Sequence, residues 1–297
     1  MGVFYYMPER NGLTIPTLDS NFIIEKSTWE LFRSIVSLSK AGVVTNVLLT
    51  GAAGTGKTSI AEQFAAKMNY RFLKMDCSLI RESRHWFGDR TASGGNIYWD
   101  RSLFAEAVSE GGGLVVLLDE ISRASPLVLN GLLPLLDHTR STYLEEIKDV
   151  LTVGPSVFFF ATANIGGQFS GTHRLDAALV DRFDIRINTH YLSLEDETRL
   201  LVAKAGIEPE LALKLATIAS NIRREVAAGS SLTVPVSTRT LISTARLFRD
   251  MNSSGRGGAA FRYTILPLYS SEGGANSERT QVLQLLQAQF GAEISLD

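Results

Sequence analysis

A glycine-rich segment that ends in Lys57 and Thr58 carries the clearest chemical signal in the sequence. From Gly51 to Thr58 it matches the phosphate-binding pattern G-x-x-x-x-G-K-[ST] at every specified position. Glycines let backbone N–H groups turn toward phosphate oxygens, and a helix that starts here would add the positive end of its dipole. We therefore expect Lys57 to contact the β- and γ-phosphates of ATP, and the Thr58 hydroxyl to bind Mg²⁺.

Two carboxylates follow the apolar run 114–118 and form a second group of candidate residues. A strand buried on both faces presents polar side chains at its carboxyl end, where ligands bind in open α/β sheets. Asp119 is predicted to hold Mg²⁺ with Thr58, and Glu120 to polarise the water that attacks the γ-phosphate. Ordinary turn chemistry is the alternative, and the phosphate-binding pattern argues against it. The predicted nucleotide-binding residues are Gly51, Ala52, Ala53, Gly54, Thr55, Gly56, Lys57, Thr58 and Asp119.

A third polar residue, Asn164, follows the apolar run 158–161. If this strand lies beside the one that ends in Asp119, the Asn164 amide can orient the attacking water or contact the γ-phosphate. The sequence thus predicts an ATP-hydrolysing site built from several strand ends.

The surrounding residues predict the elements that must position these groups. Apolar runs typical of buried strands alternate with helical patterns as far as about residue 190, which predicts a parallel sheet covered on both faces. The predicted strands are 43–50, 71–77, 114–118, 157–161 and 184–188, and the helix after the glycine-rich loop is 59–67. From the capping pattern Ser193-x-x-Asp196 onward only helices are expected, over 194–206, 208–227, 237–251 and 278–290. We expect an α/β nucleotide-binding domain, 1–192, and a helical lid domain, 193–297.

The order of several motifs resembles that of AAA+ ATPases of the MoxR-like branch. The motifs are Asp119-Glu-Ile-Ser-Arg-Ala124, Ala161-Thr-Ala-Asn164, Leu179-Val-Asp-Arg-Phe183 and Ser237-Thr-Arg-Thr240, and the resemblance covers about residues 20 to 291. Within the branch the chain looks most like CobS, the ATPase subunit of aerobic cobaltochelatase, and its relatives. It departs from that pattern at Ser122 and over Pro267-Leu-Tyr-Ser-Ser. The resemblance implies an AAA+ P-loop NTPase fold.

The resemblance also implies roles for further residues. Asn164 becomes sensor 1, Arg239 becomes sensor 2 on the helical lid, and Arg182 becomes an arginine finger that acts on a neighbour's ATP. A planar, permanently charged guanidinium suits the charge that develops on the γ-phosphate. The predicted catalytic residues are Glu120, Asn164, Arg182 and Arg239. Arg182 could instead face the dipole of a helix C-terminus or pair with Asp181, and Arg174 could share or take the finger role. The alternative for Arg239 is that it lies solvated at the start of a helix.

A finger supplied by a neighbour implies head-to-tail contacts, which close into a ring. The ring of the family is usually a hexamer. Two β-hairpin inserts are predicted. The first, 86–99, lies where MoxR-like relatives have a helix-2 insert that faces the central pore, and the second, 141–153, resembles the insert that precedes sensor 1. Aromatic side chains of the first hairpin are predicted either to grip a polypeptide or simply to pack in the fold; they are Trp86, Phe87, Tyr98 and Trp99. Nearby basic residues offer nucleic acid as an alternative ligand: Arg81, Arg84, His85 and Arg90.

Composition fits a nucleotide-driven machine and excludes several other classes. The chain has 297 residues, a net charge of −2 and one cysteine, Cys77, which rules out an internal disulfide framework and favours a reducing, cytoplasmic compartment. The scattered histidines have no zinc-ligand spacing. No apolar run approaches membrane-spanning length, so we expect no membrane partner.

Three function classes remain at this stage. The leading prediction is an ATP-hydrolysing ring that remodels a protein partner or works with a co-chaperone, such as one with a von Willebrand A-type domain as in related systems. The alternative is a nucleic-acid-directed motor or nuclease-associated ATPase, which the same core supports. A small-molecule kinase would leave the sensors, finger and lid unexplained. A non-catalytic switch would normally have lost Glu120 or Arg182.

Overall fold

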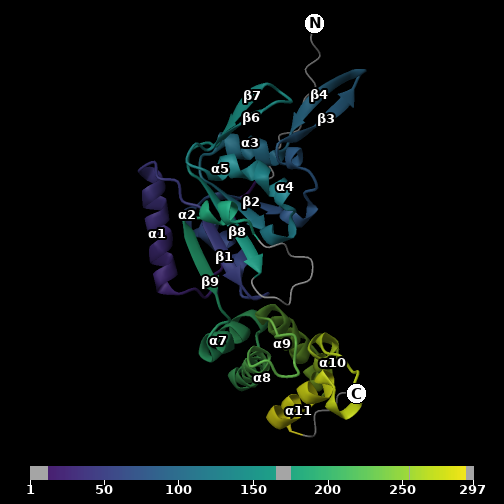
Figure 1. Ribbon diagram of the computed structural model, residues 1–297. Helices are drawn as coiled ribbons and strands as arrows, with labels where there is room; N and C mark the ends of the chain where they lie inside the picture. Colours follow the sequence, from purple (N-terminus) through teal and green to yellow (C-terminus); the bar gives the residue numbers. More distant parts are fainter. Residues whose placement is uncertain (1–12, 165–174, 254, 292–297) are drawn as a thin grey trace. The chain divides into compact units, whose positions relative to one another are not determined.

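The computed structural model describes residues 13–164, 175–253 and 255–291, which form two compact units (Figure 1). The first unit contains residues 13–19, Ile24–Ala52 and Gly56–Thr189. The second contains Ser20–Ile23, Ala53–Thr55 and the chain from His190 onward. Among the residues described, no helix is long and apolar enough to cross a membrane.

A parallel sheet forms the centre of the first unit, with strand order β2-β5-β8-β1-β9. Its strands are β1 (Val47–Gly51), β2 (Arg71–Asp76), β5 (Leu114–Asp119), β8 (Val157–Asn164) and β9 (Ile185–Thr189). Each strand overlaps one of the predicted apolar runs. The parallel direction brings the carboxyl ends of the central strands β5, β8 and β1 to one edge, where Asp119, Asn164 and Gly51 lie.

Both faces of the sheet are covered, which explains why its strands lack polar alternation. On one face, Phe158 and Phe160 pack against Phe64 of α2 (Lys57–Met68), with ring centroids 5.6 and 4.9 Å apart. Phe32 of α1 (Lys26–Lys40) packs on the same face. Between the two phenylalanines of β8, Phe159 points to the opposite face, as strand geometry requires, toward α3 (Leu103–Glu110).

Short helices and two hairpins complete the first unit. The further helices are α4 (Pro126–Leu129), α5 (Leu133–Leu136) and α6 (Ala177–Asp181). The hairpins are β3 (Gly88–Ser93) with β4 (Asn96–Arg101), and β6 (Ser141–Leu144) with β7 (Asp149–Thr152), both antiparallel. Both stand at the top of the unit in Figure 1. The two predicted hairpin inserts are therefore confirmed.

The second unit is built from helices, as the sequence predicts. They are α7 (Leu194–Ala205), α8 (Pro209–Ala227), α9 (Thr238–Asn252), α10 (Ala260–Thr264) and α11 (Glu278–Phe290). Ser193 caps α7 by accepting a hydrogen bond from the backbone N–H of Asp196, which confirms the capping pattern. The short helix α10 was not predicted, because a single turn carries too little periodicity to be recognised.

A buried ion pair ties together three helices of the second unit. Arg223 of α8 donates two hydrogen bonds to Glu197 of α7, at 2.7 and 3.0 Å. Thr238, the first residue of α9, donates to the same carboxylate at 2.7 Å. The Glu197 side chain is 1% exposed and that of Arg223 is 10% exposed. This network fixes the start of α9, where Arg239 lies.

Replacing Arg223 with Met should therefore destabilise the second unit strongly. The substitution leaves the Glu197 carboxylate buried without its cation, and breaking a buried pair in this way costs about 3–5 kcal/mol. Urea unfolding followed by circular dichroism measures the loss. Arg224→Met is the matched control, because Arg224 is the exposed neighbour on the same helix and its loss should cost less than about 0.5 kcal/mol. Equal losses for the two variants would refute a stabilising role for the pair.

Candidate functional site

The glycine-rich segment forms a loop between β1 and α2, in the strand-loop-helix order that the sequence predicts. Gly51 ends β1 with a φ of +142°, and a Cβ at this position would lie 2.3 Å from the backbone oxygen of Thr189. Gly56 caps α2 with a φ of +85°, a left-handed conformation that disfavours side chains. These two positions require glycine, so the loop geometry that the pattern predicts is present.

Lys57 lies at the first position of α2 and is 8% exposed. Its ammonium donates hydrogen bonds to the backbone oxygens of Gly51 and Ala52, at 3.0 and 2.7 Å. Burial lowers the pKa of Lys57 to about 8, and the negative charges of Asp119 and Glu120 partly oppose this shift. The side chain is thus held inside the loop, with its charge directed at the acidic end of β5.

Asp119 is the centre of a cluster of oxygen and nitrogen atoms. Its Oδ1 accepts hydrogen bonds from the hydroxyls of Thr58, at 3.1 Å, and Thr162, at 2.5 Å. Its Oδ2 lies 2.8 Å from the ammonium of Lys74 on β2. Burial raises the pKa of Asp119, but the hydrogen bonds from Lys74 and Thr162 and the charge of Lys74 outweigh it and hold the pKa below its ordinary value.

The residues at this point fit a magnesium ion. Mg²⁺ is bound in proteins by oxygen ligands, usually one or two carboxylates together with substrate phosphates. Thr58 and Asp119 supply a hydroxyl and an ionised carboxylate whose oxygens are 3.1 Å apart. The structure thus brings together the two residues that the sequence assigns to the metal.

Glu120 follows Asp119 with a backbone φ of +53°. Non-glycine residues with this left-handed conformation are uncommon and gather at functional sites. Its backbone N–H donates to the Thr162 hydroxyl at 2.8 Å, and its carboxylate pairs with Arg123 at 2.6 Å. The side chain is 41% exposed. Glu120 therefore has an accessible carboxylate on a backbone held by a hydrogen bond, next to Asp119.

Asn164 ends β8 and pairs in register with Gly51, the first residue of the glycine-rich loop. The strand beside β8 on its other side is β5, which carries Asp119. The predicted neighbourhood of Asn164 and Asp119 is thus present. Asn164 is half-buried at the edge of the sheet where the loop begins.

Arg182 caps the C-terminus of α6 and contacts its own chain. One terminal nitrogen donates to the backbone oxygen of Ala178 at 2.7 Å, and the other lies 3.2 Å from a carboxylate oxygen of Asp137. The expected alternative partner Asp181 is not used in these contacts. Within the described part of the chain, Nε of Arg182 is buried and has no hydrogen-bond partner.

Of the two other arginines that the sequence analysis considers, Arg239 and Arg174, the structure describes only Arg239. Arg239 is exposed in the first turn of α9, in the second unit. A positive charge is unfavourable at a helix N-terminus, so its position is not explained by helix stability. The alternative finger residue Arg174 lies outside the described residues.

Of the two alternatives given for the aromatic residues of the first hairpin, the structure supports packing for Trp86 and Phe87 and contradicts a contact surface there. Trp86 is fully buried, packs against Phe104 of α3 and donates its indole N–H to the backbone oxygen of Val128 at 3.0 Å. Phe87 is 7% exposed. A tryptophan whose N–H finds a backbone acceptor is stable in a core, and the sequence does not reveal that acceptor. Tyr98 on β4 is 41% exposed, which agrees with the contact alternative.

Three residues of the site make contacts that the sequence analysis did not predict. They are Thr162, which contacts both acidic residues, Lys74, which pairs with Asp119, and Arg123, which pairs with Glu120. Alternation along β8 places Thr162 and Asn164 on the same side of the strand, which is a signal that could have found Thr162. Lys74 gives a weaker signal, since it is a single charged residue within an apolar run.

Two protein-family models match separate parts of the chain. Residues 46–183 match the AAA domain of the dynein-related subfamily, and residues 197–278 match the CbbQ/NirQ/NorQ C-terminal domain. A protein from Thauera aromatica described as putative chaperone BssE is 32% identical over 230 residues, which cover 77% of this chain and 78% of that protein. The chain is a MoxR-like AAA+ ATPase.

Other relatives place this MoxR-like ATPase near the CobS subgroup. Aerobic cobaltochelatase subunit CobS from Sinorhizobium sp is 25% identical over 301 residues, covering 94% of this chain and 84% of CobS. Midasin from Dictyostelium discoideum is 26% identical over 178 residues, but these make up only 3% of midasin. The resemblance to CobS-like ATPases is therefore confirmed.

The fold of the ATPase also has solved counterparts. The Thermotoga maritima RuvB Holliday junction branch migration motor aligns with a TM-score of 0.54 and 17% identity. The alignment covers 81% of this chain and 66% of the RuvB chain. A likeness at this identity shows the fold alone, and it confirms the predicted AAA+ P-loop architecture.

Proposed function

We propose that this ATPase hydrolyses Mg-ATP as a subunit of a closed, hexameric ring in the cytoplasm and uses the energy to remodel or activate a protein partner. The observation that carries the proposal is the arrangement of Lys57, Thr58, Asp119 and Glu120 at one edge of the sheet. The description of BssE as a putative chaperone supports a protein partner. The buried, free Cys77 is compatible with a reducing compartment.

Each residue of the site has a separate task in the proposed reaction. Lys57 exchanges its contacts with loop carbonyls for contacts with phosphate oxygens, and Thr58 with Asp119 would hold Mg²⁺. The metal ion, when bound, neutralises charge on the β- and γ-phosphates. Glu120 accepts the proton of the attacking water, and Asn164 orients that water. The fixed backbone of Glu120 keeps its carboxylate close to the reacting atoms.

The ring is proposed because Arg182 is suited to act outside its own site. Its side chain is 28% exposed, and its two terminal nitrogens carry further N–H hydrogens beyond those donated to Ala178 and Asp137. A neighbouring subunit whose ATP approached this surface would receive a charge-assisted fork of hydrogen bonds. We further propose that Arg239 acts as sensor 2 on a helical lid domain, residues 193–297, of the same subunit.

The proposed contact with the protein partner is the hairpin β3–β4. Ile97 is 75% exposed and Tyr98 is 41% exposed on the β4 strand. The two-residue turn at Gly94 and Gly95, both with positive φ, makes this a tight hairpin. Exposed apolar side chains on a projecting hairpin offer contact area at low entropic cost, which favours a polypeptide partner.

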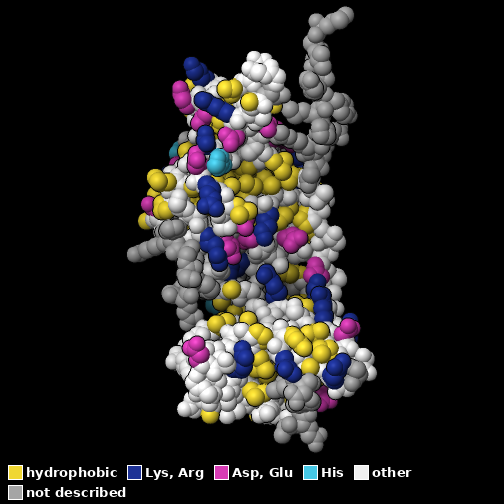
Figure 2. Space-filling view, turned by 90° about the vertical axis from the view of Figure 1, so that its right-hand side faces the viewer, with side chains coloured by type: hydrophobic (Ala, Val, Ile, Leu, Met, Phe, Trp, Pro, Cys, Tyr) yellow, Lys and Arg dark blue, Asp and Glu magenta, His cyan; other side chains and the backbone are white. Residues whose placement is uncertain are grey.

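Nucleic acid is less well supported by the charge distribution. The nearby cations are partly neutralised, since Arg84 pairs with Glu82 at 2.9 Å and His85 lies 4.0 Å from Asp89. On the face drawn in Figure 2, basic and acidic side chains of the first unit are mixed rather than gathered into one basic field. Phosphate binding would need such a field.

The hairpin gives a direct test of the proposed partner contact. The double variant Ile97→Ser with Tyr98→Ser should keep basal ATPase activity and thermal stability, because both side chains are already exposed. It should lose most of the stimulation by the partner, with at least about a tenfold higher half-maximal partner concentration, as for hot-spot residues. The partner is first obtained by affinity capture on Glu120→Gln, and ATPase activity is then measured with the unsubstituted chain and each variant.

Tyr143→Ser is the matched control, because Tyr143 is 55% exposed on the other hairpin. Stimulation that survives in the double variant, or is lost equally in the control, contradicts the assignment to β3–β4. Salt-sensitive stimulation by DNA or RNA that is lost when Arg81, Arg84 and Arg90 are neutralised would favour a nucleic-acid motor instead.

A further inference from the structure

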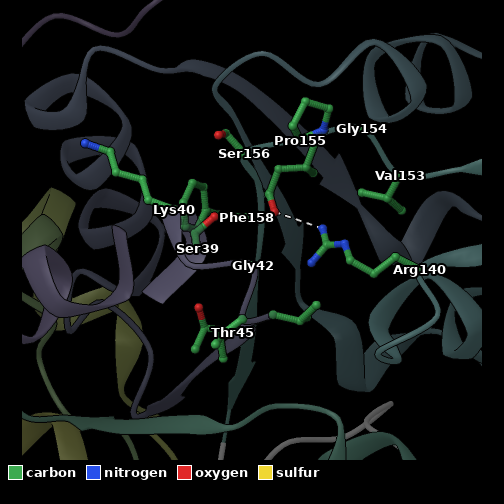
Figure 3. Close-up of a pocket in the computed structure, with 13 residues that line it drawn as sticks. Ser39, Lys40, Gly42, Thr45, Arg140, Val153, Gly154, Pro155, Ser156 and Phe158 are labelled. Carbon is green, nitrogen blue, oxygen red and sulfur yellow. Dashed lines mark hydrogen bonds between the residues drawn. The ribbon is translucent and has the colours of Figure 1, made fainter. Parts of the chain in front are cut away.

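A pocket lies in the first unit at the amino ends of β1 and β8, the opposite strand ends from the proposed ATP site. Its volume is about 370 Å³, within the range of small-molecule sites. It is lined by the end of α1, the segment Val43–Thr45 before β1, Arg140 before β6, and the segment Val153–Phe158 (Figure 3). None of these residues takes part in the proposed ATP chemistry.

The guanidinium of Arg140 lies at this pocket and is held by several contacts. Its backbone has a φ of +46°, and its carbonyl oxygen accepts a hydrogen bond from the N–H of Val153 at 2.8 Å, across the base of the hairpin β6–β7. Its guanidinium donates to the backbone oxygen of Val157 at 2.9 Å and lies over the ring of Phe159, 5.3 Å from the centroid. The guanidinium is therefore held in place by contacts with neutral groups.

This cation lacks a compensating charge among the described residues. Burial lowers the pKa of Arg140 to about 10, and no neighbouring carboxylate contributes to that shift. A buried charge without a partner is costly, and a guanidinium has five N–H donors. The bond to Val157 uses one of them. An anion entering the pocket would pair with the remaining donors.

Thr45 supplies a second, independent sign of a ligand. It is 7% exposed and lines the pocket, and its hydroxyl is buried with no hydrogen-bond partner among the described residues. Figure 3 shows Thr45 on one side of the pocket and the guanidinium of Arg140 on the other. Buried hydroxyls are rarely left without a partner, and such groups call for an explanation.

The remaining walls are largely apolar, including Phe158, Pro155 and Val153. Lys40 also lines the pocket, but its ammonium extends away from Arg140 in Figure 3. The guanidinium of Arg140 alone matches the single negative charge of a carboxylate, with which it forms a bidentate pair, better than the double charge of phosphate. We propose that this pocket binds a small molecule that carries a carboxylate on an apolar body, with the carboxylate at Arg140 and an oxygen within reach of Thr45.

Hexanoate and its neutral isostere hexanamide test the proposal when titrated calorimetrically into the full-length chain. Hexanoate should bind at least about tenfold more tightly than hexanamide, the difference expected for hydrogen bonds to a charged group. Binding should persist in Lys57→Ala, which disables the ATP site, and inorganic phosphate should bind more weakly than hexanoate. Equal binding of the two isosteres, no binding of either, or preference for phosphate would overturn the proposal.

Thr45→Val separates ligand binding from folding. If Thr45 serves a ligand, removing its hydroxyl should weaken hexanoate binding about tenfold. The melting temperature should stay unchanged or rise, because the hydroxyl has no hydrogen-bond partner among the described residues. Thr152→Val on β7, where the side chain is exposed, should change neither the binding of hexanoate nor the melting temperature.

Arg140→Gln should abolish the preference for hexanoate over hexanamide. If binding is unaffected by both Thr45→Val and Arg140→Gln, the carboxylate lies elsewhere and the assignment is wrong. An acidic hexapeptide that binds where hexanoate does not would assign the pocket to a protein.

Discussion

Glu120→Gln should bind ATP normally and lose about 10²- to 10⁴-fold in turnover, the usual contribution of a general base. Glutamine has the size of glutamate but cannot accept the proton of the attacking water. The groups that would hold the nucleotide, Lys57, Thr58 and Asp119, are untouched. Calorimetry with ATP and a phosphate-release assay measure the two effects separately.

Two controls locate the cause of the loss. Lys57→Ala should lose ATP binding itself, because it removes contacts made to the bound phosphates. Arg123→Gln removes the partner of Glu120 but leaves the base, and this half-exposed pair should contribute less than about 1 kcal/mol to stability. If Glu120→Gln binds ATP as poorly as Lys57→Ala, or if Arg123→Gln loses as much turnover, Glu120 is not the base.

Arg182→Ala should also bind ATP nearly normally but hydrolyse it about 10³- to 10⁵-fold more slowly, the range known for arginine fingers. Because Arg182 would act on a neighbour's ATP and Lys57 on its own, each variant lacks what the other supplies. Mixing Arg182→Ala with Lys57→Ala subunits should therefore restore part of the activity. Phosphate release measured across mixing ratios gives the recovery.

The contacts of Arg182 within its own chain offer an alternative that must be separated. Asp137→Asn removes its ion-pair partner and should leave turnover nearly unchanged if the finger acts between subunits. Arg186→Ala is the matched arginine control, since Arg186 also donates to a helix carbonyl, that of Val180. A mixture that stays inactive although mixed rings form, or a loss in Asp137→Asn equal to that in Arg182→Ala, would show that Arg182 supports the fold.

The sheet and the main helices could be predicted from sequence because their signals are local. A strand buried on both faces, such as β5, has to be apolar along nearly its whole length. The start of α7 is marked by its capping residue, Ser193. Helix α1 went unrecognised, and it begins without the side-chain cap that marks α7. The burial of Trp86 could not be predicted, because its indole N–H donates to the backbone oxygen of Val128, more than forty residues away in the sequence.

The candidate site divides in the same way. The residues named by motif, such as Thr58 and Asp119, do meet in space, because parallel strands end at one edge. Their partners Lys74 and Thr162 come from neighbouring strands whose register no motif encodes. The pocket at Arg140 is harder still to predict from sequence, because it forms only where the base of a hairpin and two strand ends come together.

The hydrogen bonds at Thr162 also have a direction. Its hydroxyl carries a single hydrogen, and it accepts the N–H of Glu120, so that hydrogen is left for Oδ1 of Asp119. Oδ1 also accepts the hydroxyl of Thr58, and an oxygen that accepts from two donors has no place for a proton of its own. The peptide bond of Glu120 thereby helps to keep its neighbour ionised through a hydroxyl on the next strand. A serine at position 162 would preserve this polarity, whereas a valine of similar shape would erase it.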